Sequence, residues 1–164
     1  MAMSVDGYVA ARDGSTPWSN AEWQEYLNVV NNYKNIIIGR KTYEIMLDNN
    51  EFKLFDNVSV IVVSRSIDNI SGFIFVKTPE DALEYVNDHG FDCALIGGGT
   101  MLNSHLLKQG FVDEIHIDLE PVILGSGTKL FTEDLKENNM ELIKSIKYGE
   151  NSIQLQYKIK NNLQ

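Results

Sequence analysis

The chain contains a single cysteine, Cys93, so no disulfide can form within it. Its three histidines and one cysteine do not match the spacing of a zinc site, and we expect no metal centre. No apolar run approaches the roughly 18 residues of a membrane-spanning helix. The first ten residues, MAMSVDGYVA, lack the basic start and long apolar stretch of a signal peptide. These absences predict a cytoplasmic protein without membrane spans.

Positive charge is also scarce. There are 14 basic and 23 acidic side chains among 164 residues, a formal charge of −9. Nucleic-acid backbones and anionic membranes select basic surfaces, so this balance disfavours both as partners. A small anionic ligand needs only a local group of cations or backbone N–H donors. The length is typical of one domain, which we expect to span residues 1–164.

Two periodicities alternate along the chain. Near-continuous apolar runs, typical of strands buried on both faces, predict strands at 35–38, 58–63, 73–76 and 93–96. Helical spacing of apolar residues separates several of them. From residue 113 onward the pattern alternates with period two, which is typical of antiparallel strands. The sequence therefore predicts an α/β domain with a mostly parallel sheet and antiparallel C-terminal strands.

Three of the expected parallel strands end in residues suited to phosphate. They lead into Gly97-Gly98-Gly99-Thr100-Met101, Gly39-Arg40-Lys41-Thr42 and Ser64-Arg65. Glycines allow close approach of the backbone, and a following helix N-terminus attracts anions. Ligands of open α/β sheets bind at the carboxyl ends of the strands. A tight turn and a solvated basic pair are the plainer alternatives at the first two segments.

Two carboxylates are candidates for acid–base chemistry. Asp6 precedes Gly7 near the end of a short first strand, where a plain turn is equally well supported. Glu22 stands three residues after Ser19, which fits a capping box at a helix start. That structural role explains Glu22 by itself, although it does not exclude proton transfer.

These segments together resemble the dihydrofolate-reductase-like superfamily, and most closely the C-terminal reductase domain of RibD and its stand-alone relatives. The resemblance is carried by SVDGYVA (4–10), GRKTYE (39–44), VVSR (62–65), LIGGGTML (95–102) and VDEIHIDLEPVILGSGTKLF (112–131). It implies a three-layer αβα fold and NADPH as the cofactor.

The resemblance also implies roles for individual residues. Residues expected to hold the cofactor are Gly39, Arg40, Lys41, Thr42, Ser64, Arg65, Gly97, Gly98, Gly99, Thr100 and Met101. Ser64 and Arg65 would meet the 2′-phosphate that distinguishes NADPH from NADH. Trp18, Glu120 and Pro121 are expected around the substrate, with Asp6 and Glu22 as the catalytic carboxylates.

The function implied is reduction of a small heterocycle or a ribosylaminopyrimidine by hydride transfer, as by the 5-amino-6-(5-phosphoribosylamino)uracil reductase of riboflavin biosynthesis. Folate reduction is one alternative, although Trp23 stands five residues after Trp18, where dihydrofolate reductases place an acid. A non-catalytic NADPH-binding protein on the same scaffold is the other. The family also implies a homodimer.

Overall fold

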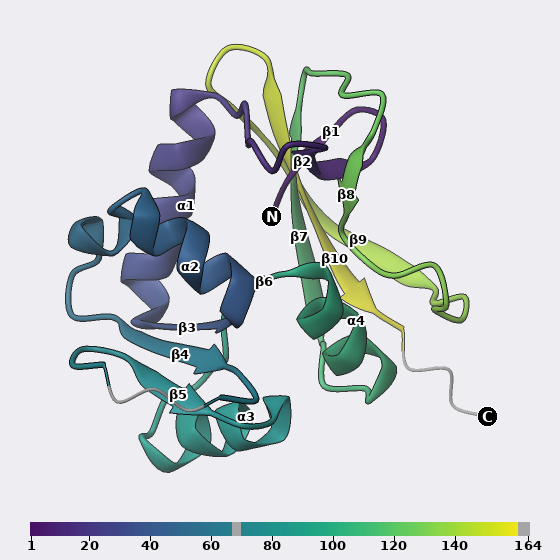
Figure 1. Ribbon diagram of the computed structural model, residues 1–164. Helices are drawn as coiled ribbons and strands as arrows, with labels where there is room; N and C mark the ends of the chain where they lie inside the picture. The colour runs from purple at the N-terminus through teal and green to yellow at the C-terminus, as the bar shows by residue number, and fades with distance from the viewer. Residues whose placement is uncertain (67–69, 161–164) are drawn as a thin grey trace. The chain divides into compact units, whose positions relative to one another are not determined.

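The apolar runs form a parallel sheet in the computed structural model, which describes residues 1–66 and 70–160 (Figure 1). Its four strands lie in the order β5-β4-β3-β6. Their bounds are β3 (Asn35–Gly39), β4 (Ser59–Val63), β5 (Ile74–Val76) and β6 (Ile96–Gly98). The two central strands are the most buried, because both of their faces are covered.

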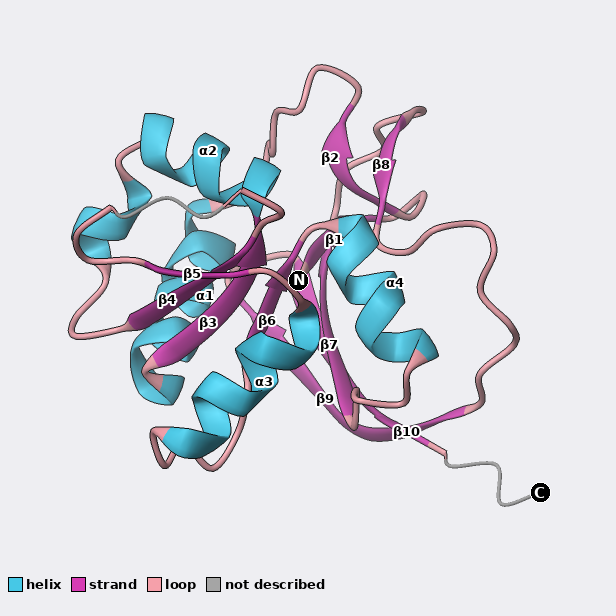
Figure 2. Ribbon diagram, turned by 60° about the horizontal axis from the view of Figure 1, so that its bottom comes forward, coloured by secondary structure: helices cyan, strands magenta, loops and turns pink. Residues whose placement is uncertain are grey.

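Helices cover this sheet on two sides. Helix α2 (Arg40–Asp48) contacts β3 and β4, whereas α3 (Pro79–Asp88) contacts β4 and β5. The two helices lie on opposite faces of the strands (Figure 2). Right-handed crossovers require this, because α2 links β3 to β4 in one direction across the sheet and α3 links β5 to β6 in the other. A short 3₁₀ helix, η1 (Glu51–Leu54), follows α2.

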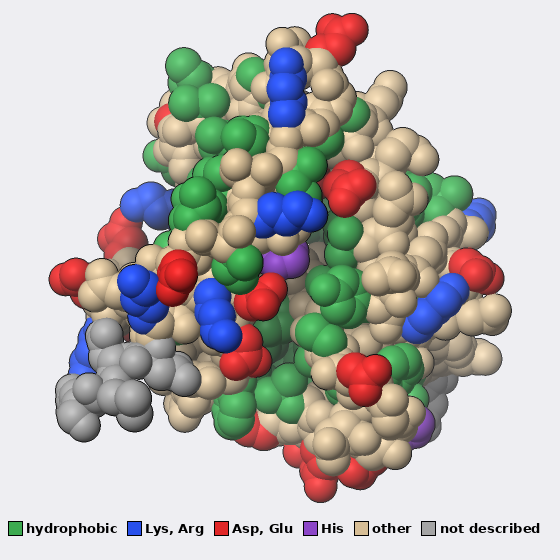
Figure 3. Space-filling view, turned by 180° about the vertical axis from the view of Figure 1, so that it is seen from behind, with side chains coloured by type: hydrophobic (Ala, Val, Ile, Leu, Met, Phe, Trp, Pro, Cys, Tyr) green, Lys and Arg blue, Asp and Glu red, His purple; other side chains and the backbone are tan. Residues whose placement is uncertain are grey.

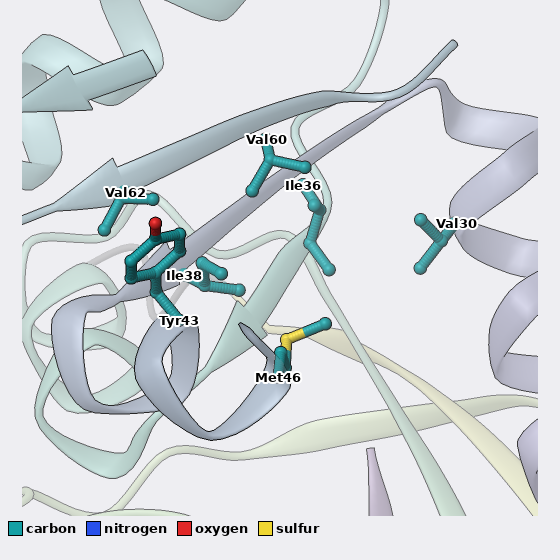
Figure 4. Packing of buried hydrophobic residues seen from close by; sticks show 7 residues of the cluster. All are labelled: Val30, Ile36, Ile38, Tyr43, Met46, Val60 and Val62. Atoms are coloured by element: carbon teal, nitrogen blue, oxygen red, sulfur yellow. The ribbon is translucent and has the colours of Figure 1, made fainter. Parts of the chain in front are cut away.

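The core of this part lies between the sheet, α2 and the helix α1 (Asn20–Tyr33). Figure 4 shows side chains from all three elements turned toward one another, namely Val30, Ile36, Ile38, Tyr43, Met46, Val60 and Val62. The ring of Tyr43 also packs against Phe52, Phe73 and Phe75 at centroid distances of 5.0–5.7 Å. Apolar burial of this kind is the main source of stability.

The alternating C-terminal segments form a second sheet, in the order β1-β7-β10-β9. Its strands are β1 (Ala2–Ser4), β7 (Glu114–Glu120), β9 (Met140–Tyr148) and β10 (Ser152–Ile159). The first strand runs parallel to β7, whereas β7, β10 and β9 are antiparallel neighbours. A two-stranded ladder joins β2 (Tyr8–Ala11) to β8 (Gly127–Lys129).

The chain divides into two compact units. One comprises residues 1–25 and the chain from 106 onward, and the other comprises residues 26–105. The boundaries fall inside α1 and inside α4 (Thr100–Lys108). The expected combination of parallel and antiparallel strands is confirmed, but the ladders separate into three sheets. That the chain is one domain stays a prediction.

One expected strand is displaced. The sequence predicts a buried strand at 93–96, but β6 begins only at Ile96 and Cys93 is exposed. The reason lies in Asn35, whose buried amide donates to the Cys93 carbonyl at 2.8 Å and accepts from Leu95 N–H at 3.1 Å. At Cys93 and Leu95, bonds to the Asn35 side chain therefore take the place of backbone bonds between neighbouring strands.

Among the described residues, no helix has the length and hydropathy needed to cross a membrane. On the face drawn in Figure 3, basic side chains are interspersed with acidic ones. The scarce positive charge is therefore not gathered into one broad patch on that face.

Candidate functional site

The strand order brings three predicted segments to one edge of the parallel sheet. Gly39 ends β3 and lies opposite Val63, the last residue of β4, so Ser64 follows directly beside it. On the other side of β3, Ile38 lies opposite Gly98 at the end of β6. Three neighbouring strands thus deliver the sequence-predicted residues to the same carboxyl edge, as expected for a ligand site in an open α/β sheet.

The glycines at this edge allow close backbone approach. A Cβ added at Gly39 would lie 3.7 Å from Gly99 N, and one at Gly99 would lie 3.3 Å from the Thr42 hydroxyl oxygen. The peptide joining Gly98 to Gly99 is cis. Gly98 has a φ of +98°, a conformation that favours glycine. The backbones at the ends of β3 and β6 therefore lie close together.

Two helices begin at this edge of the sheet. Gly39 precedes α2 and supplies no side-chain cap, while Thr100 opens α4 after β6. The positive end of a helix dipole and its first N–H groups favour an anion there. The Thr42 hydroxyl is half-buried in the first turn of α2, and Lys41 is exposed.

The other predicted cofactor residues differ in accessibility. Arg40 donates through Nε to Glu44 at 2.7 Å, and its guanidinium lies 5.9 Å from the Phe75 ring centroid. Ser64 is buried, with its hydroxyl 3.2 Å from that of Ser66. Arg65 is exposed, and so is Met101, at 76% of its surface. Lys41 and Arg65 are therefore the two exposed basic side chains among the predicted cofactor residues.

A cluster of buried carboxylates forms in the other unit. Glu22 lies in the first turn of α1, and Asp118 and Glu120 lie on β7; their exposed fractions are 5%, 8% and 1%. Burial, followed by the charge of Asp118 and a smaller effect of Glu120, raises the pKa of Glu22 to about 7. The amino group of Met1 opposes this shift. Glu22 can therefore hold a proton near neutral pH.

The neighbouring carboxylates have internal partners. Glu120 accepts from Ser19 N–H at 2.8 Å and from the Tyr148 hydroxyl at 3.0 Å. Burial acts to raise the pKa of Glu120, but hydrogen bonds from Ser152, Ser19 and Tyr148 lower it overall. Burial raises the pKa of the Tyr148 phenol strongly, so that phenol stays a donor. Glu120 is thus held as a carboxylate.

The Asp118 carboxylate has two bonding partners. Its Oδ1 accepts from Gln154 Nε2 at 2.8 Å, and its Oδ2 lies 3.2 Å from the Met1 amino group. Within the described ranges, no group of three His, Cys, Asp or Glu side chains is arranged to hold a metal ion.

The predicted capping box at the start of α1 is only half formed. Ser19 Oγ accepts from Glu22 N–H at 3.1 Å, as expected. The reciprocal bond is different, because Ser19 N–H donates to Glu120 and not to the Glu22 side chain. Glu120 has replaced Glu22 as the partner of that N–H group. The Glu22 carboxyl is therefore not committed to capping the helix.

Asp6 has a structural task at the protein surface. Its two carboxylate oxygens accept from Leu124 N–H at 3.0 Å and from Gly125 N–H at 2.7 Å. These bonds, the one from Leu124 first, lower the pKa of Asp6. The two predicted catalytic carboxylates thus differ, because Glu22 is buried and Asp6 is bonded to backbone N–H groups at the surface. A catalytic role stays a prediction for both.

Trp18 and Pro121 flank the residues of the cluster in sequence. Trp18 is half-buried, directly before Ser19, and Pro121 is exposed directly after Glu120. The sequence patterns did not point to Asp118, or to Tyr148 and Gln154, which bond to the carboxylates of the cluster. One signal was present, because Asp118 and Glu120 share one face of an alternating strand whose other face is apolar.

The family model of the RibD C-terminal domain matches residues 1–154. Two uncharacterized proteins of Bacillus subtilis (strain 168) are similar over most of both chains. YyaP is 25% identical, covering 96% of this chain and 91% of its own; YwjB is 27% identical, covering 96% and 94%. The riboflavin biosynthesis protein RibD of Corynebacterium ammoniagenes is 27% identical, over 82% of this chain and 45% of RibD.

Solved structures show the same fold. A proposed riboflavin biosynthesis protein of Shewanella sp. PV-4 has a TM-score of 0.80 at 23% identity, covering 98% of this chain and 97% of that one. The pyrimidine reductase-like protein of Corynebacterium diphtheriae has a TM-score of 0.70 at 15% identity, covering 98% and 90%. The fold is thus that of RibD reductase domains. This chain belongs to the RibD C-terminal domain family, which is related to the reductase of riboflavin biosynthesis.

Proposed function

We propose that this protein is an NADPH-dependent reductase that transfers hydride to a small heterocyclic or ribosylaminopyrimidine substrate. One observation carries the proposal: the ends of β4, β3 and β6 place Ser64, Gly39 and Gly98 on adjacent strands. Family membership supports it, because RibD proteins include a reductase of a phosphoribosylaminopyrimidine.

The residues at this edge fit a dinucleotide. Gly39 and Gly99 carry no side chain that would keep a phosphate from the backbone N–H groups, and the nearby Thr42 adds a hydroxyl donor. Two helix N-termini offer N–H groups to the same anion. Ser64 and Arg65 suit a second, separate phosphate, because Arg forms paired hydrogen bonds with phosphate oxygens. When bound, NADPH supplies the hydride.

Glu22 would supply the proton for the reduction. A general acid works best when its pKa lies near the working pH, and the pKa of Glu22, raised by burial and by Asp118, is about 7. Hydrogen bonds hold Glu120 as a carboxylate, and the charges of Asp118 and Glu120 act to raise the pKa of Glu22. The acid is then protonated in a large fraction of molecules at neutral pH.

The first test is cofactor choice. Arg65→Ala should weaken NADPH binding at least tenfold, since one lost charge-assisted phosphate contact is worth about 1.5–3 kcal/mol. NADH lacks the 2′-phosphate, so its affinity should barely change. Isothermal titration of both cofactors with wild type and variant measures this. Lys53→Ala, which removes an exposed cation of the same unit in η1, after the C-terminal end of α2, is the control. Equal losses for the two cofactors would refute the 2′-phosphate assignment.

The second test is turnover. The protein should oxidise NADPH with 5-amino-6-(5-phosphoribosylamino)uracil or a related heterocycle, and Glu22→Gln should abolish most of that rate.

Dihydrofolate reduction blocked by an antifolate would point to folate reduction. NADPH binding without oxidation across pyrimidine, pterin and carbonyl substrates would identify a non-catalytic binding protein. If saturating NADPH fails to raise the melting temperature, the cofactor proposal is wrong, because a ligand at 100 times its Kd stabilises by about 2.7 kcal/mol.

A further inference from the structure

We propose that Asp118 is a positioning residue for the catalytic proton: its fixed negative charge on β7 keeps that proton on Glu22. This inference rests on the proposed role of Glu22 as the proton donor.

The first step is placement. Asp118 and Glu120 are two residues apart on one strand, so their side chains leave β7 on the same face. Glu22 reaches this cluster from the first turn of α1, whose start is fixed to β7 by the bond from Ser19 N–H to Glu120. The three carboxylates thus belong to two elements, α1 and β7, which this hydrogen bond joins directly.

The second step is that the three carboxylates accept unequal numbers of hydrogen bonds. Asp118 is held by Gln154 and the Met1 amino group, and Glu120 is held by Ser19 and Tyr148. Glu22 is buried, with 5% of its surface exposed, and burial is the largest cause of its raised pKa, with no hydrogen bond among the causes. A proton shared among three buried carboxylates settles on the one with the fewest donors.

The third step is the full set of charges facing Glu22. Asp118 and Glu120 on β7 are negative and favour the protonated acid, while the Met1 amino group before β1 favours the carboxylate. Tyr148 on β9 is neutral and bonded to Glu120. Asp118 acts more strongly on Glu22 than Glu120 does. Removing the Asp118 charge is therefore the most direct perturbation.

The experiment follows the Glu22 carboxyl by NMR, with ¹³C-labelled glutamate and a C-terminal tag that leaves the Met1 amino group in place. Glu22→Gln identifies the resonance. Wild type should titrate with a midpoint near 7. In Asp118→Asn, which keeps an oxygen for Gln154, the midpoint should fall by about one pH unit. It should stay above the ordinary glutamate value, because burial persists.

Two control variants separate charge from structure. Asp118→Glu keeps the charge and should leave the midpoint near that of wild type. Glu114→Gln removes a charge from the exposed end of the same strand, about 13 Å away along β7, and should leave the midpoint unchanged. If Asp118→Asn does not fold, Glu120→Gln provides the second charge-loss variant, with a smaller downward shift expected.

An unchanged Glu22 midpoint in Asp118→Asn would overturn the inference. So would an ordinary glutamate midpoint in wild type, which needs no variant to fold. The titration uses neither NADPH nor substrate, so its result is independent of whether turnover is found. Conversely, a reductase whose Glu22 titrates independently of Asp118 would retain the proposed function and lose only this inference.

Discussion

Glu22 makes a testable contribution to stability at the scale of single residues. Its pKa is about 7 in the folded protein and near the ordinary 4.5 when unfolded, so the folded state binds the proton more tightly. Stability from this group is complete below pH 4.5 and is lost as pH rises toward 7. The loss is on the order of 3 kcal/mol, the free energy of a pKa difference of this size.

Glu22→Gln should remove this slope, because glutamine mimics the protonated acid at every pH. Urea unfolding between pH 4.5 and 8 measures it, with the variant more stable than wild type at pH 8. Glu25→Gln, the same chemical change in the same helix, should leave the wild-type slope intact. If wild type and Glu22→Gln show parallel pH profiles, Glu22 is not an unusual acid.

Local residue patterns identified Glu22 as a candidate and left its role open between a helix cap and a proton donor. Glu120, 98 positions after Glu22, decides against the cap. It accepts the hydrogen bond from Ser19 N–H that a capping box would give to Glu22. Asp6 shows the reverse case, because its partners at 124 and 125 give it a structural task. Neither pairing leaves a trace in the neighbouring sequence.

At the scale of elements, the contact between β6 and β3 gives a prediction about glycine. A Cβ at Gly97 would lie 2.6 Å from Ile36 Cδ1 and 2.9 Å from Ile38 Cγ2, and both isoleucines are fully buried. Gly97→Ala should therefore destabilise the protein by about 1–3 kcal/mol through overpacking. Chemical denaturation measures the change.

Gly39→Ala is the matched control for that experiment. The nearest atom to its Cβ would lie 3.7 Å away, and the φ of Gly39 is −78°, which alanine adopts without strain. We expect its stability to stay close to that of wild type. Equal destabilisation by both substitutions would show that close β6–β3 packing is not the cause.

Most helices and strands were predictable because their signals are local. The apolar runs 35–38 and 58–63 match β3 and β4 closely, and the cap, proline and acids at 78–81 match the start of α3, where the Thr78 hydroxyl accepts from Asp81 N–H. The predicted start of this strand, at residue 93, was wrong. The Leu95 N–H there bonds to the side chain of Asn35, which lies 60 positions earlier in the chain. Distant side-chain bonds override local preference there.

At the scale of the whole molecule, the edge strand β9 bears on the predicted homodimer. It ends the sheet and exposes Met140, Leu142 and Ile143 at 40–52% of their surfaces. An open apolar edge favours pairing with another strand. Glu141 near its start and Lys147 near its end would meet as opposite charges in an antiparallel pair with a second copy.

Leu142→Lys should therefore shift the protein from dimer to monomer, as measured by size-exclusion chromatography with light scattering. Leu54→Lys makes the same change at an equally exposed leucine, at 52%, in the other unit and should leave the dimer intact. A monomeric wild-type protein at micromolar concentration, or a dimer unaffected by Leu142→Lys, would contradict a β9 interface.

The net charge of −9 describes the surface as a whole and not the proposed cofactor edge. There, Lys41 and Arg65 accompany the N-termini of α2 and α4 at the ends of parallel strands. A small positive region inside an acidic surface can hold an anionic dinucleotide, because helix dipoles and nearby cations act over short distances.

The sequence by itself determined the α/β class, the strand ends that carry glycine, serine and arginine, and the family, since these depend on residues adjacent in the chain. The tertiary structure decided which of these strand ends are neighbours, through the order β5-β4-β3-β6. It also decided that the start of α1 is bonded to β7 through Ser19 and Glu120, with Glu22, Asp118 and Glu120 all buried. The physical reason is that burial and electrostatic interaction depend on distance in space, and residues almost 100 positions apart approach each other only in the folded chain.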